Sequence, residues 1–174
     1  MKARLTHVFT AALLLAATPA IAQETSTNRV SSKVDWSVFV ENDPTQCWIV
    51  SSPTGTENTK GGRVVAVNRG DILMFVSFWP TENKLGEVSF AGGYPFAEGS
   101  TVNLSIGDSS FELFTTGETA WAASASDDQK IVTAMKRGVS AVVQGQSSRG
   151  TNTKDTFSLR GFTAAFEDAE QRCN

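Results

Sequence analysis

Short runs of apolar residues that alternate with polar ones recur along most of the chain. In residues 101–106, valine, leucine and isoleucine alternate with threonine, asparagine and serine. A period of two is typical of a strand with one buried face, and clusters of glycine, asparagine and aspartate separate the runs. We expect strands at 35–40, 47–50, 63–68, 71–79, 87–90, 101–106, 110–115, 139–144 and 156–159, with Arg69-Gly70 as the turn of a hairpin.

Two segments have helical rather than alternating spacing. Residues 127–137 begin with Asp127 and Asp128, which suit an N-terminal cap, and Gly138 follows a basic last turn. In residues 162–172, phenylalanine and alanine recur three and four positions apart. Many short strands with two short α-helices predict an all-β fold, a β-sandwich of short antiparallel strands.

The first 22 residues have the pattern of a signal peptide. Lys2 and Arg4 precede an apolar stretch that is too short to span a bilayer, and Ala20-Ile21-Ala22 is a small-x-small cleavage site. We expect cleavage after Ala22, a flexible lead-in over 23–33, a single domain over 34–174 and no transmembrane segment. Export would place the protein in the periplasm, with secretion or association with the outer membrane as alternatives.

The composition excludes several classes of function. The chain has 174 residues, 40% of them hydrophobic, with 15 Lys+Arg against 18 Asp+Glu and a net charge of −3. No basic stretch could follow a phosphate backbone, so nucleic acid is not an expected partner. Cleavage would also remove His7, the only histidine, and with it the usual base and the commonest metal ligand. We therefore expect no catalytic residues, no metal and no cofactor.

Cys47 and Cys173 are the only two cysteines. An even number in an exported chain predicts a disulfide, which would join an early strand to the last helical turn. The alternative is a pair of free thiols with a catalytic or metal-binding role, which neither a close spacing nor a neighbouring histidine favours.

Two tripeptides are candidate functional motifs. Gly107-Asp108-Ser109 is similar to the nucleophile segment of some lipid-type hydrolases, but a turn between two strands explains it without the missing histidine. Arg69-Gly70-Asp71 is a sequence that integrins recognise on exposed loops. Here it lies between two predicted strands, where Gly70 suits a turn.

Paired carboxylates are the remaining route to hydrolysis without histidine. The available acids include Glu112, Glu118, Asp127 and Asp128. Their spacing places no two of them across a cleft, and the two aspartates are already expected to cap a helix.

The loop Gly92-Gly93-Tyr94-Pro95-Phe96 places the only tyrosine and a phenylalanine beside two permissive glycines. Aromatic residues on loops often provide much of the energy of a binding interface. These five residues, within the loop 92–99, are therefore the predicted partner-binding site. The alternative is that Tyr94 or Phe96 packs into one end of the sandwich.

The C-terminal stretch 153–165 contains the segment Ser158-Leu159-Arg160-Gly161-Phe162-Thr163-Ala164-Ala165, and Cys173 follows. Together with Trp36, Cys47-Trp48, Gly93-Tyr94-Pro95 and 134–138, it resembles the invasion-associated locus B family of Gram-negative envelope proteins. The resemblance covers roughly residues 34–173. It implies a β-rich envelope protein that is linked in some pathogens to invasion of host cells, and it provides no catalytic residues.

We therefore expect a non-catalytic, exported protein that acts as a binding or accessory module, with a link to host-cell invasion or envelope integrity implied by the resemblance. The expected partner is another envelope protein or a host-surface protein, and the sequence leaves its identity and the oligomeric state open. The alternatives are a carboxylate-dependent cell-wall glycosidase and an inhibitor of a periplasmic hydrolase.

Overall fold

The computed structural model describes residues 28–43 and 45–173. The predicted signal peptide and residues 23–27 lie outside the described residues. The described part forms strands, two α-helices and one 3-10 helix. In chain order these are β1 (Arg29–Lys33), β2 (Trp36–Asn42), β3 (Thr45–Ser51), β4 (Gly55–Lys60), β5 (Arg63–Val64), β6 (Leu73–Trp79), η1 (Pro80–Glu82), β7 (Lys84–Ala91), β8 (Thr101–Ile106), β9 (Ser109–Thr116), β10 (Thr119–Trp121), α1 (Ala125–Arg137), β11 (Ser140–Gln146), β12 (Asn152–Ser158) and α2 (Phe162–Arg172).

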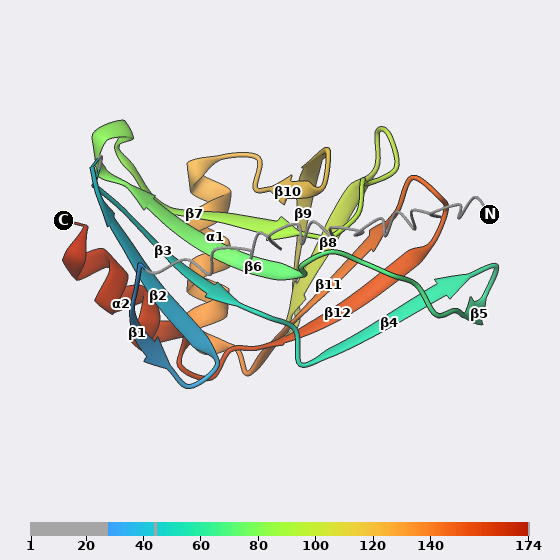
Figure 1. Cartoon of the computed structure of the whole chain (residues 1–174), viewed down its shortest axis with the longest axis horizontal. Coiled ribbons are helices and arrows are strands. Elements are labelled where there is room, and N and C mark those ends of the chain that lie inside the picture. The colour runs from blue at the N-terminus through green and yellow to red at the C-terminus, as the bar shows by residue number, and fades with distance from the viewer. Residues whose placement is uncertain (1–27, 44, 174) are drawn as a thin grey trace, which may run out of the picture.

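The strands form one hydrogen-bonded sheet in the order β1-β2-β3-β6-β7-β10-β9-β8-β11-β12-β4-β5. The sheet bends so that the half containing β2, β3, β6 and β7 faces the half containing β8, β11, β12 and β4 (Figure 1). Phe90 in β7 and Phe157 in β12 are distant in strand order, yet their ring centroids lie 6.1 Å apart across the interior. The predicted all-β sandwich of antiparallel strands with two short helices is confirmed.

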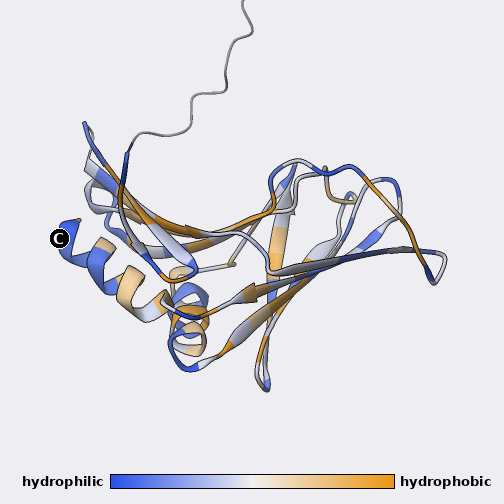
Figure 2. Cartoon of the chain, turned by 60° about the horizontal axis from the view of Figure 1, so that its bottom comes forward, coloured by the Kyte–Doolittle hydropathy of each residue, from blue (hydrophilic) through white to orange (hydrophobic). Residues whose placement is uncertain are grey.

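The alternating pattern identifies the buried face of the strands. In β8, Val102, Leu104 and Ile106 are buried, whereas Thr101 and Asn103 are exposed. Figure 2 shows polar and apolar residues following one another along the ribbons. Each half of the sheet therefore contributes one apolar face to a shared core, and burial of that surface drives folding.

Both predicted helices are present, and α1 packs against β7 whereas α2 packs against β2 and β3. The predicted cap of α1 is wrong, because the helix begins two residues earlier than expected and Ser124 caps it. The Ser124 hydroxyl accepts a hydrogen bond from the Asp127 N–H at 3.2 Å. Asp128 accepts a hydrogen bond from the Val88 N–H at 2.8 Å instead, and this contact fixes α1 to β7. Gly138 follows α1 as predicted.

Two further predictions are wrong. Residues 29–33, expected to belong to a flexible lead-in, form β1, because their backbone groups pair with the edge of β2. The segments 63–68 and 71–79 do not form a hairpin. β5 pairs with β4, β6 pairs with β3 and β7, and residues 65–72 cross between the two halves of the sheet. Arg69 anchors the crossover, because its guanidinium is buried with a carboxylate of β12.

The predicted disulfide is confirmed and joins Cys47 in β3 to Cys173, directly after α2. Both cysteines are buried, so the bond fixes α2 against the half of the sheet that contains β3. Neither helix of the described part is long and apolar enough to cross a membrane.

Candidate functional site

A polar cavity of about 560 Å³ lies beside the loop 92–99. Its walls come from six places: β4, the crossover, the start of the loop, the β9–β10 turn, the β11–β12 turn and the start of β12. Most of the side chains that line it are hydroxyls, amides or charged groups. A concave site where polar groups converge from distant segments is a common form of ligand-binding site.

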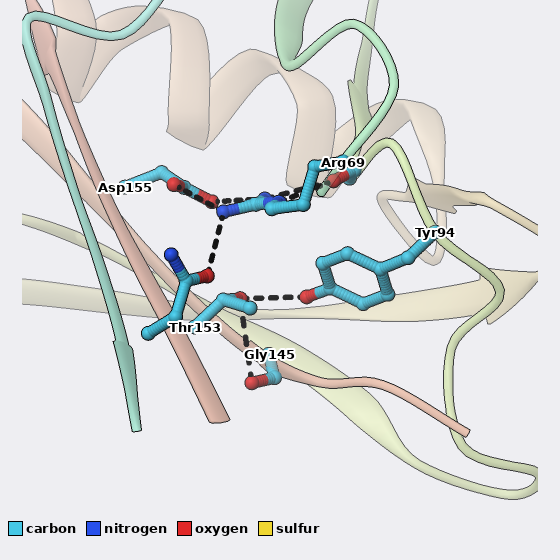
Figure 3. Close-up of polar contacts among 7 residues, drawn as sticks. Arg69, Tyr94, Gly145, Thr153 and Asp155 are labelled. Carbon is cyan, nitrogen blue, oxygen red and sulfur yellow. Dashed lines mark hydrogen bonds and ion pairs between the residues drawn. The ribbon is translucent and has the colours of Figure 1, made fainter. Parts of the chain in front are cut away.

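The side chain of Arg69 is buried against this cavity and pairs with Asp155 of β12. Its Nη1 and Nη2 atoms donate to the two carboxylate oxygens of Asp155 at 2.8 and 2.7 Å (Figure 3). Nε and Nη2 also donate to the Gly92 carbonyl at 3.0 and 2.8 Å, and Nη1 donates to Asn58 Oδ1 at 3.3 Å. All five guanidinium N–H groups are thus used within the protein. The charge of Arg69 therefore fixes the cavity wall and is not available to a ligand.

Tyr94 connects the ion pair to the wall of the cavity. The Arg69 guanidinium carbon lies 4.9 Å from the centroid of the Tyr94 ring, which is within cation–π range. The Tyr94 phenol oxygen lies 2.6 Å from the Thr153 hydroxyl. Burial raises the pKa of the Tyr94 phenol, although the hydrogen bond to Thr153 and the charge of Arg69 oppose the rise. The phenol is therefore a neutral hydrogen-bonding group at neutral pH.

Two glycines let the loop approach its neighbours closely. Gly93 has a φ of 70°, and a Cβ there would lie 2.6 Å from the Gly70 carbonyl oxygen. The Gly70 N–H donates to the Gly93 carbonyl at 2.9 Å. A Cβ at Gly92 would lie 2.8 Å from the Phe96 ring. The loop is therefore held against the crossover, and the wall of the cavity is formed before any ligand arrives.

The predicted partner-binding loop has a buried part and an exposed part. Phe96 is 6% exposed, belongs to the core and lies 5.0 Å from the Tyr94 ring, between centroids. Tyr94 is half-buried, whereas Pro95, Glu98 and Gly99 are exposed. The two aromatic side chains thus hold the loop in place, and its exposed positions remain the predicted contact surface.

Two opposite charges line the cavity without pairing with each other. Glu118 lies in the β9–β10 turn and Arg149 in the β11–β12 turn, and both are exposed. Among the residues that the structure describes, neither side chain has a hydrogen-bond or ion-pair partner. The rim therefore carries one positive and one negative group that a ligand could reach.

The two candidate tripeptides do not form sites. Gly107-Asp108 is the turn between β8 and β9, where Gly107 has a φ of 55°, and Ser109 is the first residue of β9, paired with Ile106. Arg69-Gly70-Asp71 does not display its arginine, because the Arg69 side chain is only 6% exposed.

The candidate carboxylates are also dispersed. Glu112 lies on β9, Asp127 pairs with Lys130 at 2.8 Å, and Asp128 binds the Val88 N–H. Of three cavities within residues 28–43 and 45–173, none has more than one carboxylate in its lining. The same residues contain no group of three or more His, Cys, Asp or Glu side chains that could hold a metal ion.

A second groove, of about 830 Å³, lies between the β8–β9 hairpin and α1. Its rim includes Lys130, which is already paired with Asp127, and Arg137. Most of its lining side chains are exposed residues of one helix face and one hairpin, so its walls are less constrained than those of the cavity at Arg69.

The C-terminal motif has a structural explanation. The Ser158 carbonyl accepts a hydrogen bond from Trp36 Nε1 at 3.0 Å, and the Phe162 ring lies 5.0 Å from the Trp36 ring. Gly161 has a φ of 86°, and a Cβ there would collide with the Lys33 carbonyl oxygen. The motif therefore fixes α2 against the β1–β2 turn.

Asp155 and Thr153, which hold Arg69 and Tyr94, were not predicted as site residues. Thr153, Asp155 and Phe157 occupy alternate positions of β12, and all three are buried. An aspartate on the inward face of a strand needs a buried cation as its partner. The alternating pattern of β12 could therefore have indicated that Asp155 pairs with a buried basic side chain. The strand predicted at 156–159 began too late to place Asp155 on that face.

Comparisons with known proteins agree with this fold. The family model described as "Invasion associated locus B (IalB) protein" matches residues 36–170. Among solved structures, the crystal structure of invasion associated protein B from Bartonella henselae is similar, with a TM-score of 0.55 and 15% sequence identity. That match covers 80% of this chain and 94% of the other, and at this identity it establishes the fold alone. No curated protein matches the chain.

Proposed function

Because the matching family model spans most of its length, the chain belongs to the invasion associated locus B family, and we propose that it is a non-catalytic binding or accessory protein of the bacterial envelope. Its partner is another envelope protein or a host-surface protein. Contact occurs through the exposed part of the loop 92–99 and the rim of the neighbouring cavity. The observation that carries this proposal is the rigid loop, which the buried Arg69 and the half-buried Tyr94 hold in one conformation.

The chemistry of the cavity supports binding more than catalysis. Arg69 and Asp155 neutralise each other, and the Tyr94 phenol has a raised pKa. A glycosidase would need two carboxylates that face each other across a cleft, and Glu118 is the one carboxylate that lines this cavity in the described part of the chain. A hydrolase inhibitor would use the same rigid loop, so it is one form of the proposed binding role.

Export to the periplasm is part of the proposal. The disulfide between Cys47 and Cys173 supports it, because such bonds persist in oxidising compartments. The predicted signal peptide provides the route. A role in host-cell invasion accords with the family description, and a role in envelope integrity is the alternative.

Cross-linking to an envelope extract tests the proposal, with a charge reversal on the loop as the probe. Glu98→Lys changes an exposed loop position, and Glu112→Lys makes the same change on the exposed face of β9. We expect the wild type and Glu112→Lys to capture the same partner, and Glu98→Lys to lose most of it at an unchanged melting temperature. Equal capture by all three proteins would contradict the loop as the contact surface.

A further inference from the structure

The geometry points to a neutral saccharide as the ligand of the cavity beside Arg69. This inference rests on the proposed binding function and names the chemistry that the cavity recognises. A volume of about 560 Å³ lies within the range of roughly 300–1,000 Å³ that is usual for small-molecule sites. Such sites are usually lined by apolar side chains, whereas most residues that line this one carry a hydroxyl, an amide or a charge, and its surface is polar and apolar in similar shares. A hydroxyl-rich ligand therefore suits it better than an apolar one.

The lining has both hydrogen-bond donors and hydrogen-bond acceptors that are not used within the protein. Asn58 uses only its Oδ1 atom, which accepts from Arg69, and Ser147 Oγ accepts only from the Thr151 N–H. Within the described part of the chain, the side chains of Asn68, Ser148 and Thr151 form no hydrogen bond. Hydroxyl and amide groups both donate and accept, as sugar hydroxyls do. Several lining groups are thus available for hydrogen bonds to a saccharide.

The charges favour a neutral ligand. The positive charge of Arg69 is paired with Asp155, and the two free charges of the rim, Glu118 and Arg149, are opposite in sign. An anion would meet the carboxylate of Glu118 as well as Arg149, and a cation would meet the guanidinium of Arg149 as well as Glu118, so the rim favours neither sign of charge. A neutral molecule with many hydroxyl groups can accept from one of these side chains and donate to the other.

The wall is also preorganised for a ligand with little flexibility. Tyr94 is held by Arg69, Phe96 and Thr153, so its ring position is fixed. Tyr94 and Pro95 add apolar surface against which the C–H face of a sugar ring can pack. A wall that is already ordered reduces the entropy lost on binding, which matters for small polar ligands.

Tyr94 makes a direct test possible, because it is the only tyrosine of the chain and lines the cavity. Protein labelled with fluorotyrosine has one fluorine resonance from residue 94. We expect N,N′-diacetylchitobiose or cellobiose to shift this resonance saturably, with a Kd near or below about 1 mM. The charged sugar glucuronic acid and the tripeptide trialanine should shift it several-fold less at the same concentration.

Two serine substitutions locate the binding. Ser148→Trp places a bulky side chain at an exposed position of the cavity rim, and Ser109→Trp makes the same change at an exposed position of the second groove. The sugar-induced shift should disappear in Ser148→Trp and persist in Ser109→Trp. Thr151→Val, which removes one lining hydroxyl, should weaken binding several-fold and provides a second variant should Ser148→Trp fail to fold.

Three results would overturn the inference. They are the absence of a saturable shift with either disaccharide, a larger shift with trialanine than with the sugars, and loss of the sugar response in Ser109→Trp alone. Cross-linking of a partner that depends on Glu98 would still support the proposed binding function in each of these cases. The two proposals can therefore fail separately.

Discussion

Arg69 and Asp155 lie 86 residues apart in the sequence and form a bidentate ion pair with side chains that are 6% and 0% exposed. The pair joins the crossover between β5 and β6 to the middle of β12. It therefore links the crossover to β12 through side chains, in addition to the backbone ladders of the sheet. Because an isolated buried charge is costly, each residue depends on the other.

Removing the arginine tests this dependence. We expect Arg69→Ala to lower the free energy of unfolding by about 3–5 kcal/mol, because Asp155 would remain buried without its counter-charge. Urea denaturation measures the change. Arg149→Ala, at the exposed rim of the same cavity, is the control and should change stability by less than about 0.5 kcal/mol. Equal stability of the two variants would contradict a structural role for the pair.

Tyr94 should behave as a packed residue that also lines the cavity. We expect Tyr94→Ala to lower the free energy of unfolding by about 2–3 kcal/mol, because it removes the ring between Arg69 and Phe96. Tyr94→Phe keeps the ring and loses the bond to Thr153, so it should cost only about 1 kcal/mol. Thermal denaturation distinguishes the two. A Tyr94→Ala protein as stable as the wild type would show that the ring does not support the loop.

Gly161 permits a close contact that no other residue could make. Gly161→Ala should lower the free energy of unfolding by at least about 3 kcal/mol for two reasons. The new Cβ would collide with the Lys33 carbonyl oxygen, and alanine would be strained at the left-handed φ of this position. Gly150 has a φ of 75°, but a Cβ there would meet no atom of its surroundings within 4 Å, so Gly150→Ala should cost only about 1 kcal/mol. Chemical denaturation measures the loss of stability in both variants, and the difference between them is the cost of the close contact. Equal losses would show that the contact with Lys33 has no cost.

Asp168 makes stability depend on pH in the acid range. Its carboxylate oxygens lie 3.1 Å from Lys33 Nζ and 2.6 Å from Arg172 Nε. Burial opposes ionisation, but hydrogen bonds from Arg172, Ser31 and Lys33 outweigh it and lower the pKa of Asp168 to about 2. Because the folded pKa lies below the unfolded value of about 3.8, the stabilisation is complete above that value and is lost as the pH falls toward 2.

Replacing this carboxylate should remove that dependence. We expect Asp168→Asn to be less stable than the wild type by about 1–2 kcal/mol at neutral pH, a figure that allows for screening by solvent. The difference should shrink below a pH of about 4 and vanish only below about 2. Denaturation at a series of pH values measures it, with the exposed Glu167→Gln as control. A difference that stays constant down to the lowest pH would rule out the ion pairs as its cause.

The disulfide should contribute strongly to stability. Its cysteines are 126 residues apart, so the double variant Cys47→Ser, Cys173→Ser regains much conformational freedom when unfolded. We expect a loss of about 2–5 kcal/mol in the free energy of unfolding. Wild-type protein reduced with dithiothreitol should unfold at the same denaturant concentration as the double variant. A double variant as stable as the oxidised wild type would contradict this contribution of the disulfide.

The elements that sequence predicts well are those with a strong local pattern. β8 was predicted with its observed bounds, and α2 likewise, because both have a regular period and clear turn residues at their ends. β1 was missed because serine and lysine at an edge strand have no apolar face to reveal them. β1 forms because the edge of β2 offers unpaired backbone groups, and the local sequence of residues 29–33 does not show that this edge is nearby.

The candidate site was only partly predictable for a similar reason. The loop 92–96 was identified from its aromatic residues and glycines, and it does border the cavity. Arg69-Gly70 has the composition of a turn, so the sequence predicted a hairpin there. The hairpin is absent, and Arg69 pairs instead with Asp155, 86 residues away, a contact that local sequence does not show. A long-range ion pair can thus override the local preference for a turn.

The disulfide between Cys47 in β3 and Cys173 at the end of α2 also determines how the protein responds to a pulling force. Tension applied at residue 173 passes through the disulfide to Cys47, so α2 is bypassed and does not unwind. β3 is paired with β2 on one side and with β6 on the other, and both ladders share the pull. Force from the C-terminal side would therefore be resisted by two rows of backbone hydrogen bonds, and rupture would begin in the sheet rather than in the helix.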